Sequence, residues 1–94
     1  MFSLHPKLAA DTILIGELPL SRALLMNNAE LPWVILVPRR ANASEWHSLE
    51  IQDQRQLHVE SIGVGKLLMT LFGGDKLNTG AIGNLVSQLH VHHV

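Results

Sequence analysis

Three short apolar runs follow one another early in the chain. Thr12 to Gly16 and Ser21 to Met26 are rich in apolar and β-branched residues, and the proline-containing stretch Glu17 to Leu20 separates them. Trp33 to Val37 is a run of large apolar residues closed by a proline. Runs of this length with short, turn-prone connections favour strands. The pattern therefore predicts an antiparallel meander of three strands.

The spacing of apolar residues then becomes helical. Leu57, Val64 and Leu68 recur at intervals of seven and four residues, which places them on one face of a helix. We expect this helix to run from about Gln52 to Phe72 and to end at the glycine pair that follows. A glycine within it, such as Gly65, would let another segment approach the helix closely.

Shorter elements flank this helix. Ser44 is a suitable N-cap for one helical turn that ends at about Leu49. After the long helix, Lys76 to Ile82 and Leu85 to Val94 predict two more strands around the turn-prone pair Gly83-Asn84. The order of strands, helix and strands predicts an α+β fold, with an antiparallel sheet of about five strands, one short helix and one long helix on a face of the sheet.

The composition fits one small packed domain. Of 94 residues, 47% are hydrophobic and 16% are charged, and no repeat or linker divides residues 1–94, so we expect a single domain. The formal charge is −1 at pH 7, and Arg39-Arg40 is the only tight basic pair. Because nucleic-acid binding normally needs a basic stripe, we expect no nucleic-acid partner. A single nucleotide needs far fewer positive charges.

Other features bear on the location of the protein. The chain has no cysteine, which excludes disulfides and thiolate chemistry. Met1 to Ala10 lacks the basic start and apolar run of a signal peptide, and no apolar stretch approaches the ~20 residues of a membrane span. We therefore expect a cytoplasmic protein with no membrane partner.

Histidines gather at the end of the chain. Six are present, and three of them lie in the last five positions. Alternate side chains of a strand share a face, so Gln88, His90 and His92 would point one way, and Leu89 and Val91 would point into the core. Neighbours on the polar face would lie about 6.6–7 Å apart, a spacing that brackets one phosphate group or one metal ion. Imidazole is a nucleophile or a ligand near neutral pH.

Three interpretations of this cluster remain open on physical grounds. The histidines could lie on a solvent-facing strand edge without a chemical role, or His90 and His92 could be two ligands of a zinc site that still needs a third. The third interpretation is phosphate chemistry. It is favoured by Asn78-Thr79-Gly80 and Gly83-Asn84, whose small and amide residues let a ligand approach backbone N–H groups. The isolated histidines His5, His47 and His58 are more typical of surface or cap positions.

The segment that carries the cluster resembles the signature of the histidine triad family. That signature is His-φ-His-φ-His-φ-φ, where φ is apolar, with a glycine and an amide residue shortly upstream. Gly83 to His92 reads Gly-Asn-Leu-Val-Ser-Gln-Leu-His-Val-His. Leu24 to Asn27, Trp33 to Pro38 and Lys76 to Gly80 are similar to other family segments and occur in the family's order, so the resemblance covers nearly the whole chain.

The resemblance implies a hydrolase or nucleotidyl transferase that acts at the α-phosphate of a nucleotide or a dinucleoside polyphosphate. His90 matches the nucleophile, which forms a covalent nucleotidyl-histidine that water hydrolyses. His92 matches the last histidine, which contacts the phosphate or helps to protonate the leaving group. Asn84 matches a phosphate-binding amide, and Asn27 matches a ribose-contacting position. The resemblance also implies a homodimer, and no metal or other cofactor is expected.

Two positions depart from the family pattern. Gln88 replaces the first histidine, in a Gln-Leu-His-Val-His form that resembles a bacterial branch of the family. An amide can position a leaving group but cannot donate a proton as imidazolium does. His93 occupies an apolar position, and Val94 ends the sequence, so we expect the last strand to lose its final pairs, leaving the leaving-group side open or completed by a partner subunit. Two alternatives are a nucleotide-binding module with little catalysis and a histidine-based metal-binding module.

Overall fold

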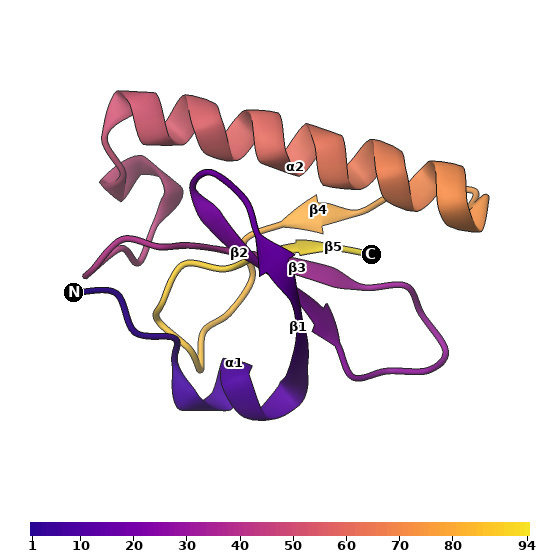
Figure 1. The fold of residues 1–94 in the computed structure, drawn as a ribbon, viewed down its shortest axis with the longest axis horizontal. Helices are drawn as coiled ribbons and strands as arrows, with labels where there is room; N and C mark the ends of the chain where they lie inside the picture. Colours follow the sequence, from indigo (N-terminus) through magenta and orange to yellow (C-terminus); the bar gives the residue numbers. More distant parts are fainter.

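The structure is a computed structural model that describes residues 1–94 throughout. Along the chain, two α-helices, five strands and one 3-10 turn follow one another (Figure 1): α1 (Pro6–Asp11), β1 (Thr12–Glu17), β2 (Ser21–Met26), β3 (Val34–Pro38), η1 (Trp46–Ser48), α2 (Ile51–Phe72), β4 (Thr79–Gly80) and β5 (Val91–His93).

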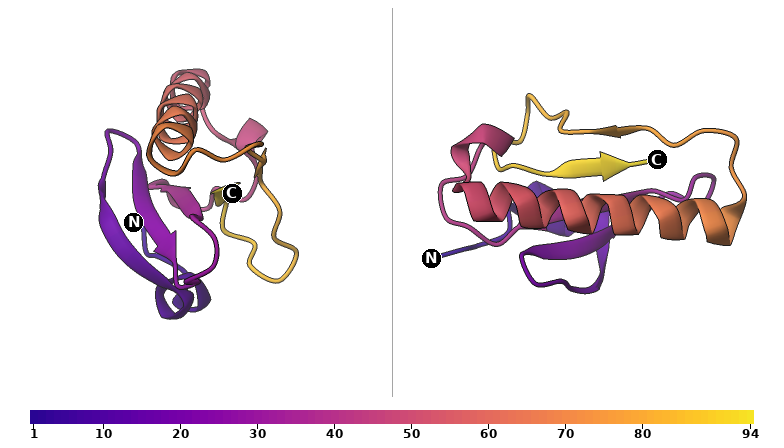
Figure 2. Two further views of the ribbon diagram at one scale, coloured as in Figure 1. Left: turned by 90° about the vertical axis from the view of Figure 1, so that its right-hand side faces the viewer. Right: turned by 90° about the horizontal axis from the view of Figure 1, so that it is seen from above.

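The five strands form one antiparallel sheet in the order β1-β2-β3-β5-β4. The helix α2 lies along one face of the sheet, and α1 lies on the other side, at the bottom of Figure 1 and of the left view of Figure 2. The α+β fold with a five-stranded antiparallel sheet and one long helix, predicted from the order of elements, is confirmed.

The middle strand β3 separates two apolar cores. All five of its residues are buried. Leu36 belongs to a cluster with Leu57 of α2 and Leu89, whereas Ile35 belongs to a second cluster with Leu8 of α1 and Val86. A strand that is covered on both faces reads as a continuous apolar run. This explains why β3 is the strongest strand pattern in the sequence.

The helix α2 ends where its glycine pair predicts. Gly73 adopts a left-handed conformation with φ of 60°, and its N–H donates to the carbonyl of Met69 at 3.0 Å. Within the helix, Gly65 is a point of close approach, because a Cβ there would lie 2.6 Å from Leu77 Cδ2. Leu77 belongs to the segment that leads to β4, so this glycine lets that segment pack against the helix.

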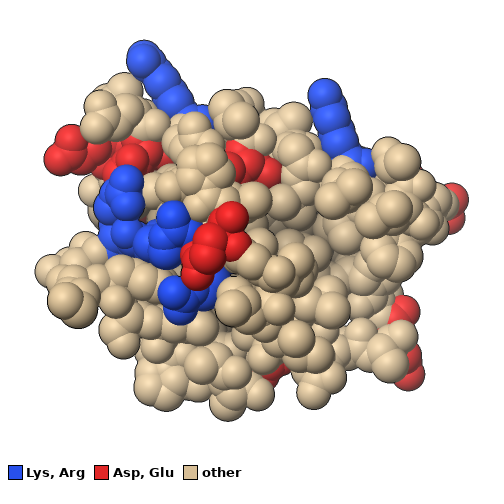
Figure 3. All heavy atoms as spheres, in the orientation of Figure 1, with Lys and Arg blue, Asp and Glu red and all other residues tan.

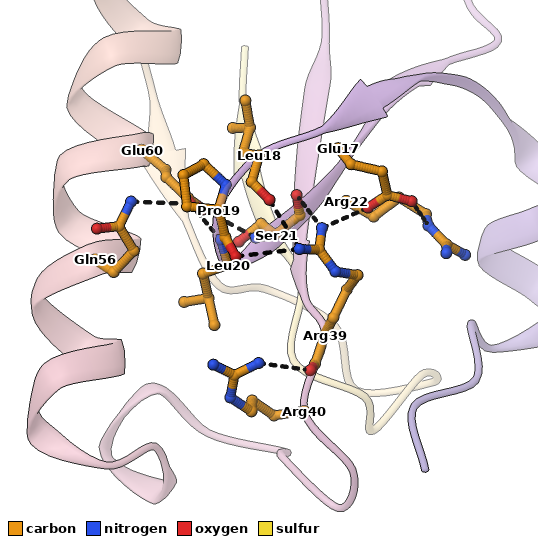
Figure 4. Close-up of polar contacts among 10 residues, drawn as sticks. All are labelled: Glu17, Leu18, Pro19, Leu20, Ser21, Arg22, Arg39, Arg40, Gln56 and Glu60. Carbon is orange, nitrogen blue, oxygen red and sulfur yellow. Dashed lines mark hydrogen bonds and ion pairs between the residues drawn. The ribbon is translucent and has the colours of Figure 1, made fainter.

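The turn between β1 and β2 is held from two sides (Figure 4). On one side the buried carboxylate of Glu60, from α2, accepts hydrogen bonds from the N–H groups of Leu20 and Ser21 at 2.7 and 3.1 Å. On the other side the guanidinium of Arg39, which follows β3, donates to the carbonyls of Leu18 and Ser21. These bonds supply partners to the N–H groups of Leu20 and Ser21 and to the carbonyl of Leu18, and they reinforce the turn in which the Leu18 N–H donates to the Ser21 carbonyl.

Charged side chains are interleaved rather than gathered into a stripe on the face drawn in Figure 3. Arg22 and Arg39 both pair with the carboxylate of Glu17, and Arg40 pairs with Asp53. The hydrogen bond from Arg22 lowers the pKa of the Glu17 carboxyl, and Arg39 acts in the same direction. No helix has the length and apolarity that a membrane crossing requires.

Several predicted elements need correction. The strands expected at 76–82 and 85–94 shrink to Thr79–Gly80 and Val91–His93. Ser44 does not cap the short helix: Glu45 precedes it without a side-chain cap, and the element is a single 3-10 turn. The helix α1 was not predicted. It begins with Pro6 after His5, whose Nδ1 accepts a hydrogen bond from the N–H of Lys7, so His5 is the cap residue that its isolated position suggested.

The shortening of the last strand has a local cause. Before β5 the backbone turns away from the sheet, and the N–H of Leu89 donates to the carbonyl of Ala43 instead of to a neighbouring strand. Alternation of apolar and polar residues is shared by strands and by other extended segments, so the pattern alone did not separate the two.

Candidate functional site

His90 lies just before β5 with its ring almost completely buried, at 7% exposure. Its Nδ1 is 2.7 Å from the carbonyl oxygen of Gln88. A carbonyl can only accept a hydrogen bond, so Nδ1 carries the proton. The neutral ring then has its free lone pair on Nε2, which is the form that a histidine nucleophile needs.

His92 lies beside His90 with the two ring centroids 5.0 Å apart in an edge-on arrangement. Its Nδ1 is 3.0 Å from the indole Nε1 of Trp33, and its Nε2 is 2.9 Å from the carbonyl oxygen of Ile82. Burial lowers the pKa of the His92 imidazole, whereas its hydrogen bond to the Ile82 carbonyl acts in the opposite direction and does not outweigh burial. His92 is therefore held as a neutral ring with partners on both nitrogens.

Gly83 packs directly against the ring of His90. A Cβ on Gly83 would lie 2.3 Å from His90 Cε1 and 2.5 Å from Nε2, distances that real side chains do not reach. Only a residue without a side chain fits here. Asn84 follows with an exposed side chain, and both residues line the hollows beside His90. The structure thus brings Gly83 and Asn84 to the proposed nucleophile.

A cavity of about 280 Å³ opens between α1, the facing ends of β2 and β3, and the loop that carries Gly83. Its polar lining includes His90 and His92, together with Lys7 and Asp11 of α1. Most of the remaining wall is apolar: Leu8, Met26, Trp33, Ile35, Ile82, Leu85 and Val86. An apolar cleft with a few convergent polar groups is the usual form of a small-molecule site.

Gln88 is tied to the start of the chain. Its side-chain Oε1 accepts from the N–H of His5 at 2.8 Å, and its Nε2 donates to the carbonyl of Ser3 at 2.9 Å. The side-chain amide thus bonds to the backbone of this segment as a neighbouring β-strand would. The residue at the first triad position therefore fixes the segment that leads into α1, and its backbone carbonyl holds His90.

Asn78 and Asn27, two further residues predicted from the sequence, differ in whether they line a cavity. The backbone of Asn78 pairs with that of Val94 through two hydrogen bonds of 2.9 Å, and Asn78 lines a second hollow, of about 530 Å³, with Trp33 and His92. Asn27 is exposed at the end of β2, where its N–H donates to the carbonyl of Asp11. Asn27 is not among the residues that line either cavity.

His93 points to the opposite side of the sheet from His90 and His92, as alternation along the strand predicts. It is fully buried beneath α2, where its Nε2 contacts the hydroxyl of Ser61 and its Nδ1 lies 3.1 Å from the carbonyl oxygen of Val34. Burial lowers the pKa of its imidazole. The three histidines do not converge, and no group of three or more His, Cys, Asp or Glu side chains is placed to hold a metal ion.

Comparison with known protein families shows to which family the chain belongs. The model of the HIT domain matches residues 7–94 of the chain. The chain belongs to the HIT family. This match includes the strands, α2 and the segment that holds His90 and His92.

Solved histidine triad proteins agree with this HIT assignment. A protein from Marinobacter aquaeolei VT8 is 50% identical with a TM-score of 0.97, over 99% of this chain and 68% of that one. One from Bradyrhizobium japonicum is 49% identical with a TM-score of 0.96, over 98% and 69% of the two chains. One from Sinorhizobium meliloti 1021 is 44% identical with a TM-score of 0.96, over 98% and 68%. None of the curated proteins compared with the chain matches it.

Sequence reasoning missed part of this HIT site. The sequence placed Trp33 only in an apolar run, although its indole N–H bonds to His92. Leu8 and Lys7 of α1 line the cavity but drew no attention, because α1 itself was not predicted. A usable signal was present: His5 followed by Pro6 is a cap residue with a proline at the first helical position.

Proposed function

We propose that this chain binds a nucleotide and cleaves it at the α-phosphate through a covalent nucleotidyl group on His90. The observation that carries the proposal is the hydrogen bond between His90 Nδ1 and the Gln88 carbonyl, because it leaves the Nε2 lone pair available for attack. Membership of the HIT family supports a nucleotide-binding function of the hydrolase or transferase type.

The proposed reaction has two displacements at phosphorus. In the first, Nε2 of His90 forms a bond to the α-phosphorus while the bond from phosphorus to the leaving group breaks, and the leaving group takes the electron pair and a proton. In the second, a water oxygen attacks the same phosphorus and loses its proton, and the bond to Nε2 breaks. The products are a nucleoside monophosphate, the protonated leaving group and neutral His90. In a transferase, another hydroxyl takes the place of water.

Different residues around His90 would bind different parts of the substrate. The apolar wall of the 280 Å³ cavity, with Trp33 as its largest side chain, suits a base. The loop with Gly83 and Asn84 offers backbone N–H groups and an amide to the phosphate oxygens. Asn27 would reach the ribose from the rim, and Asn78 would contact parts of the substrate beyond the α-phosphate. No cofactor enters this scheme.

In the proposed reaction, His92 and Gln88 mainly hold other groups in place. Both nitrogens of His92 have partners, so its contact with a phosphate oxygen requires it to release the Ile82 carbonyl. The amide of Gln88 is bonded to Ser3 and His5, and its backbone carbonyl orients His90. In this arrangement water, rather than either side chain, supplies the proton to the leaving group.

We also propose that the protein acts as a homodimer. Large apolar side chains remain exposed on α2, among them Ile62, Leu67 and Leu71 at 48%, 57% and 64%. Soluble monomers rarely expose so many large apolar side chains on one helix. Light scattering coupled to gel filtration gives the mass in solution. A mass of one chain at micromolar concentration would overturn this part of the proposal.

Mutation of His90 tests the proposed mechanism. His90→Ala should lower turnover of adenosine 5′-phosphoramidate and of a diadenosine polyphosphate by more than about a thousandfold, with an unchanged circular dichroism spectrum. His47→Ala is the matched control, because His47 is exposed on η1. If His90→Ala kept its activity, the mechanism would be wrong. If the wild type bound nucleotide without turning it over, the chain would be a binding module.

A further inference from the structure

Trp33 and His92 share a hydrogen bond that decides where the proton of His92 sits. The indole Nε1 lies 3.0 Å from His92 Nδ1, and the two ring centroids are 5.6 Å apart. An indole N–H can only donate. His92 Nδ1 is therefore the acceptor and carries no proton, so the single proton of the neutral ring is on Nε2.

The second nitrogen of His92 bonds to the loop between β4 and His90. Nε2 lies 2.9 Å from the carbonyl oxygen of Ile82, which can only accept. Both hydrogen bonds therefore require the proton on Nε2, and neither forms when the proton is on Nδ1. Without the indole N–H, the Ile82 carbonyl would be the one partner left that favours the proton on Nε2, and the other tautomer would leave that carbonyl without a donor.

Ile82 immediately precedes Gly83, the residue that packs against the Cε1–Nε2 edge of His90. The first part of the loop between β4 and His90 is exposed, with Ile82 and Leu85 at 75% and 88%, whereas Val86 and Leu89 farther along are buried in the two cores. The bond from His92 to the Ile82 carbonyl is thus a polar contact that ties the exposed part of this loop down beside the nucleophile.

We propose that Trp33 is a positioning residue for His90, which acts by fixing the tautomer of His92 and thereby the place of the Gly83-Asn84 loop. This inference rests on the proposed function in one respect: the same loop is the one that would bind the α-phosphate. Trp33 would then set the distance between nucleophile and phosphorus without touching either. Small displacements of a reacting group cost much of the rate.

A simpler role for Trp33 is to form part of the cavity wall, since it also packs against the core cluster that contains Ile35. The two roles differ in what they require of the side chain. A wall needs an aromatic ring, whereas positioning needs the N–H. Trp33→Phe keeps a ring and removes the N–H, and Trp46→Phe makes the same change in a tryptophan of the other core.

Nitrogen-15 NMR of uniformly labelled protein reads the tautomer directly. In the wild type and in Trp46→Phe we expect His92 to carry its proton on Nε2 alone, with a scalar coupling across the hydrogen bond between Trp33 Nε1 and His92 Nδ1 in both. In Trp33→Phe we expect a mixture of tautomers and displaced amide signals of Gly83 and Asn84. An unmixed tautomer with undisturbed loop signals in Trp33→Phe would overturn the proposal.

Kinetics give a second readout. In Trp33→Phe the kcat for adenosine 5′-phosphoramidate should fall about 3- to 10-fold, the effect of one hydrogen bond, with KM changed by less than about 2-fold. A rise in KM at unchanged kcat would mean that Trp33 is only a wall. If the wild type itself showed no turnover, the proposed function would fail, and the NMR result would still decide the role of Trp33.

Discussion

Gly83 lies so close to His90 that a methyl group on its Cα would come within 2.3 Å of the imidazole Cε1. The glycine belongs to an exposed loop, and the histidine is nearly buried at the end of the sheet. Their contact brings the phosphate-binding side of the proposed site to the edge of the ring that carries the free lone pair.

Gly83→Ala should therefore displace the loop or rotate His90. We expect kcat to fall about 10- to 100-fold, because the nucleophile and the phosphate-binding groups no longer fit together. Gly63→Ala is the control: a Cβ at Gly63 meets nothing within 4 Å, so alanine should stabilise α2 by about 0.5–1 kcal/mol and leave turnover unchanged. Steady-state kinetics and urea unfolding measure the two effects. Unchanged kcat in Gly83→Ala would contradict the packing described for this loop.

The carboxylate of Glu60 should matter for stability rather than for catalysis. It accepts from two backbone N–H groups of the β1–β2 turn and from the side-chain amide of Gln56. Glu60→Gln keeps the shape but presents N–H groups to donors, so we expect the free energy of unfolding to fall by about 2–3 kcal/mol. Urea denaturation measures this, with Glu45→Gln at an exposed position as the control. Equal stability of the two variants would show that the turn does not need the charge.

The stability of the fold should decrease on acidification through His93 and His92. Burial lowers the pKa of both rings in the folded protein, whereas the unfolded chain titrates near its ordinary value of about 6.5. Below that pH the unfolded state binds more protons, so this contribution is complete above about pH 6.5 and is lost as the pH falls through the folded-state pKa values.

Urea unfolding measured from pH 8 down to pH 5 tests this dependence. The double variant Ser61→Ala/His93→Val removes the buried ring together with its hydroxyl partner and should show a shallower decline than the wild type. His58→Ala removes an exposed histidine and should follow the wild type. Parallel pH curves for the wild type and the double variant would exclude His93 as a source of the acid sensitivity.

Gln88 should hold the N-terminal segment in place. Gln88→Leu has nearly the same shape but loses the bonds to Ser3 and His5. We expect hydrogen exchange at the His5 amide to become at least about tenfold faster and the first residues to be cleaved sooner by trypsin or a similar protease. Gln52→Leu, at an exposed position of α2, is the control. Unaltered exchange at His5 would mean that the segment is held by other contacts.

Local patterns predicted the parts of the fold that local forces decide. The apolar period of α2 and its glycine stop gave the helix to within one residue, and the unbroken apolar run gave β3 to within one residue. The pairing of His90 with His92, and the separation of His93, followed from alternation over a few residues. The assignment of His90 as nucleophile stays a prediction, which rests on the motif that its neighbours in sequence carry.

The remainder depends on contacts between distant residues, which a single sequence does not reveal. The amide of Gln88 bonds to residues more than 80 positions away, and Trp33 bonds to His92 across 59 positions. The sequence offered Gln88 as a group near the leaving group and Trp33 only as part of an apolar run. The structure gives both side chains polar partners: Ser3 and His5 for Gln88, and His92 for Trp33.

If His90 carries the nucleotidyl group during the reaction, rapid quenching should trap it there. The wild type, His90→Ala and His92→Ala are mixed with an adenosine 5′-phosphorimidazolide, quenched within milliseconds and examined by intact-mass and peptide mass spectrometry. We expect an added adenylyl group on His90 in the wild type and in His92→Ala, and none in His90→Ala. An adduct of equal yield in His90→Ala, or turnover without any adduct in the wild type, would contradict it.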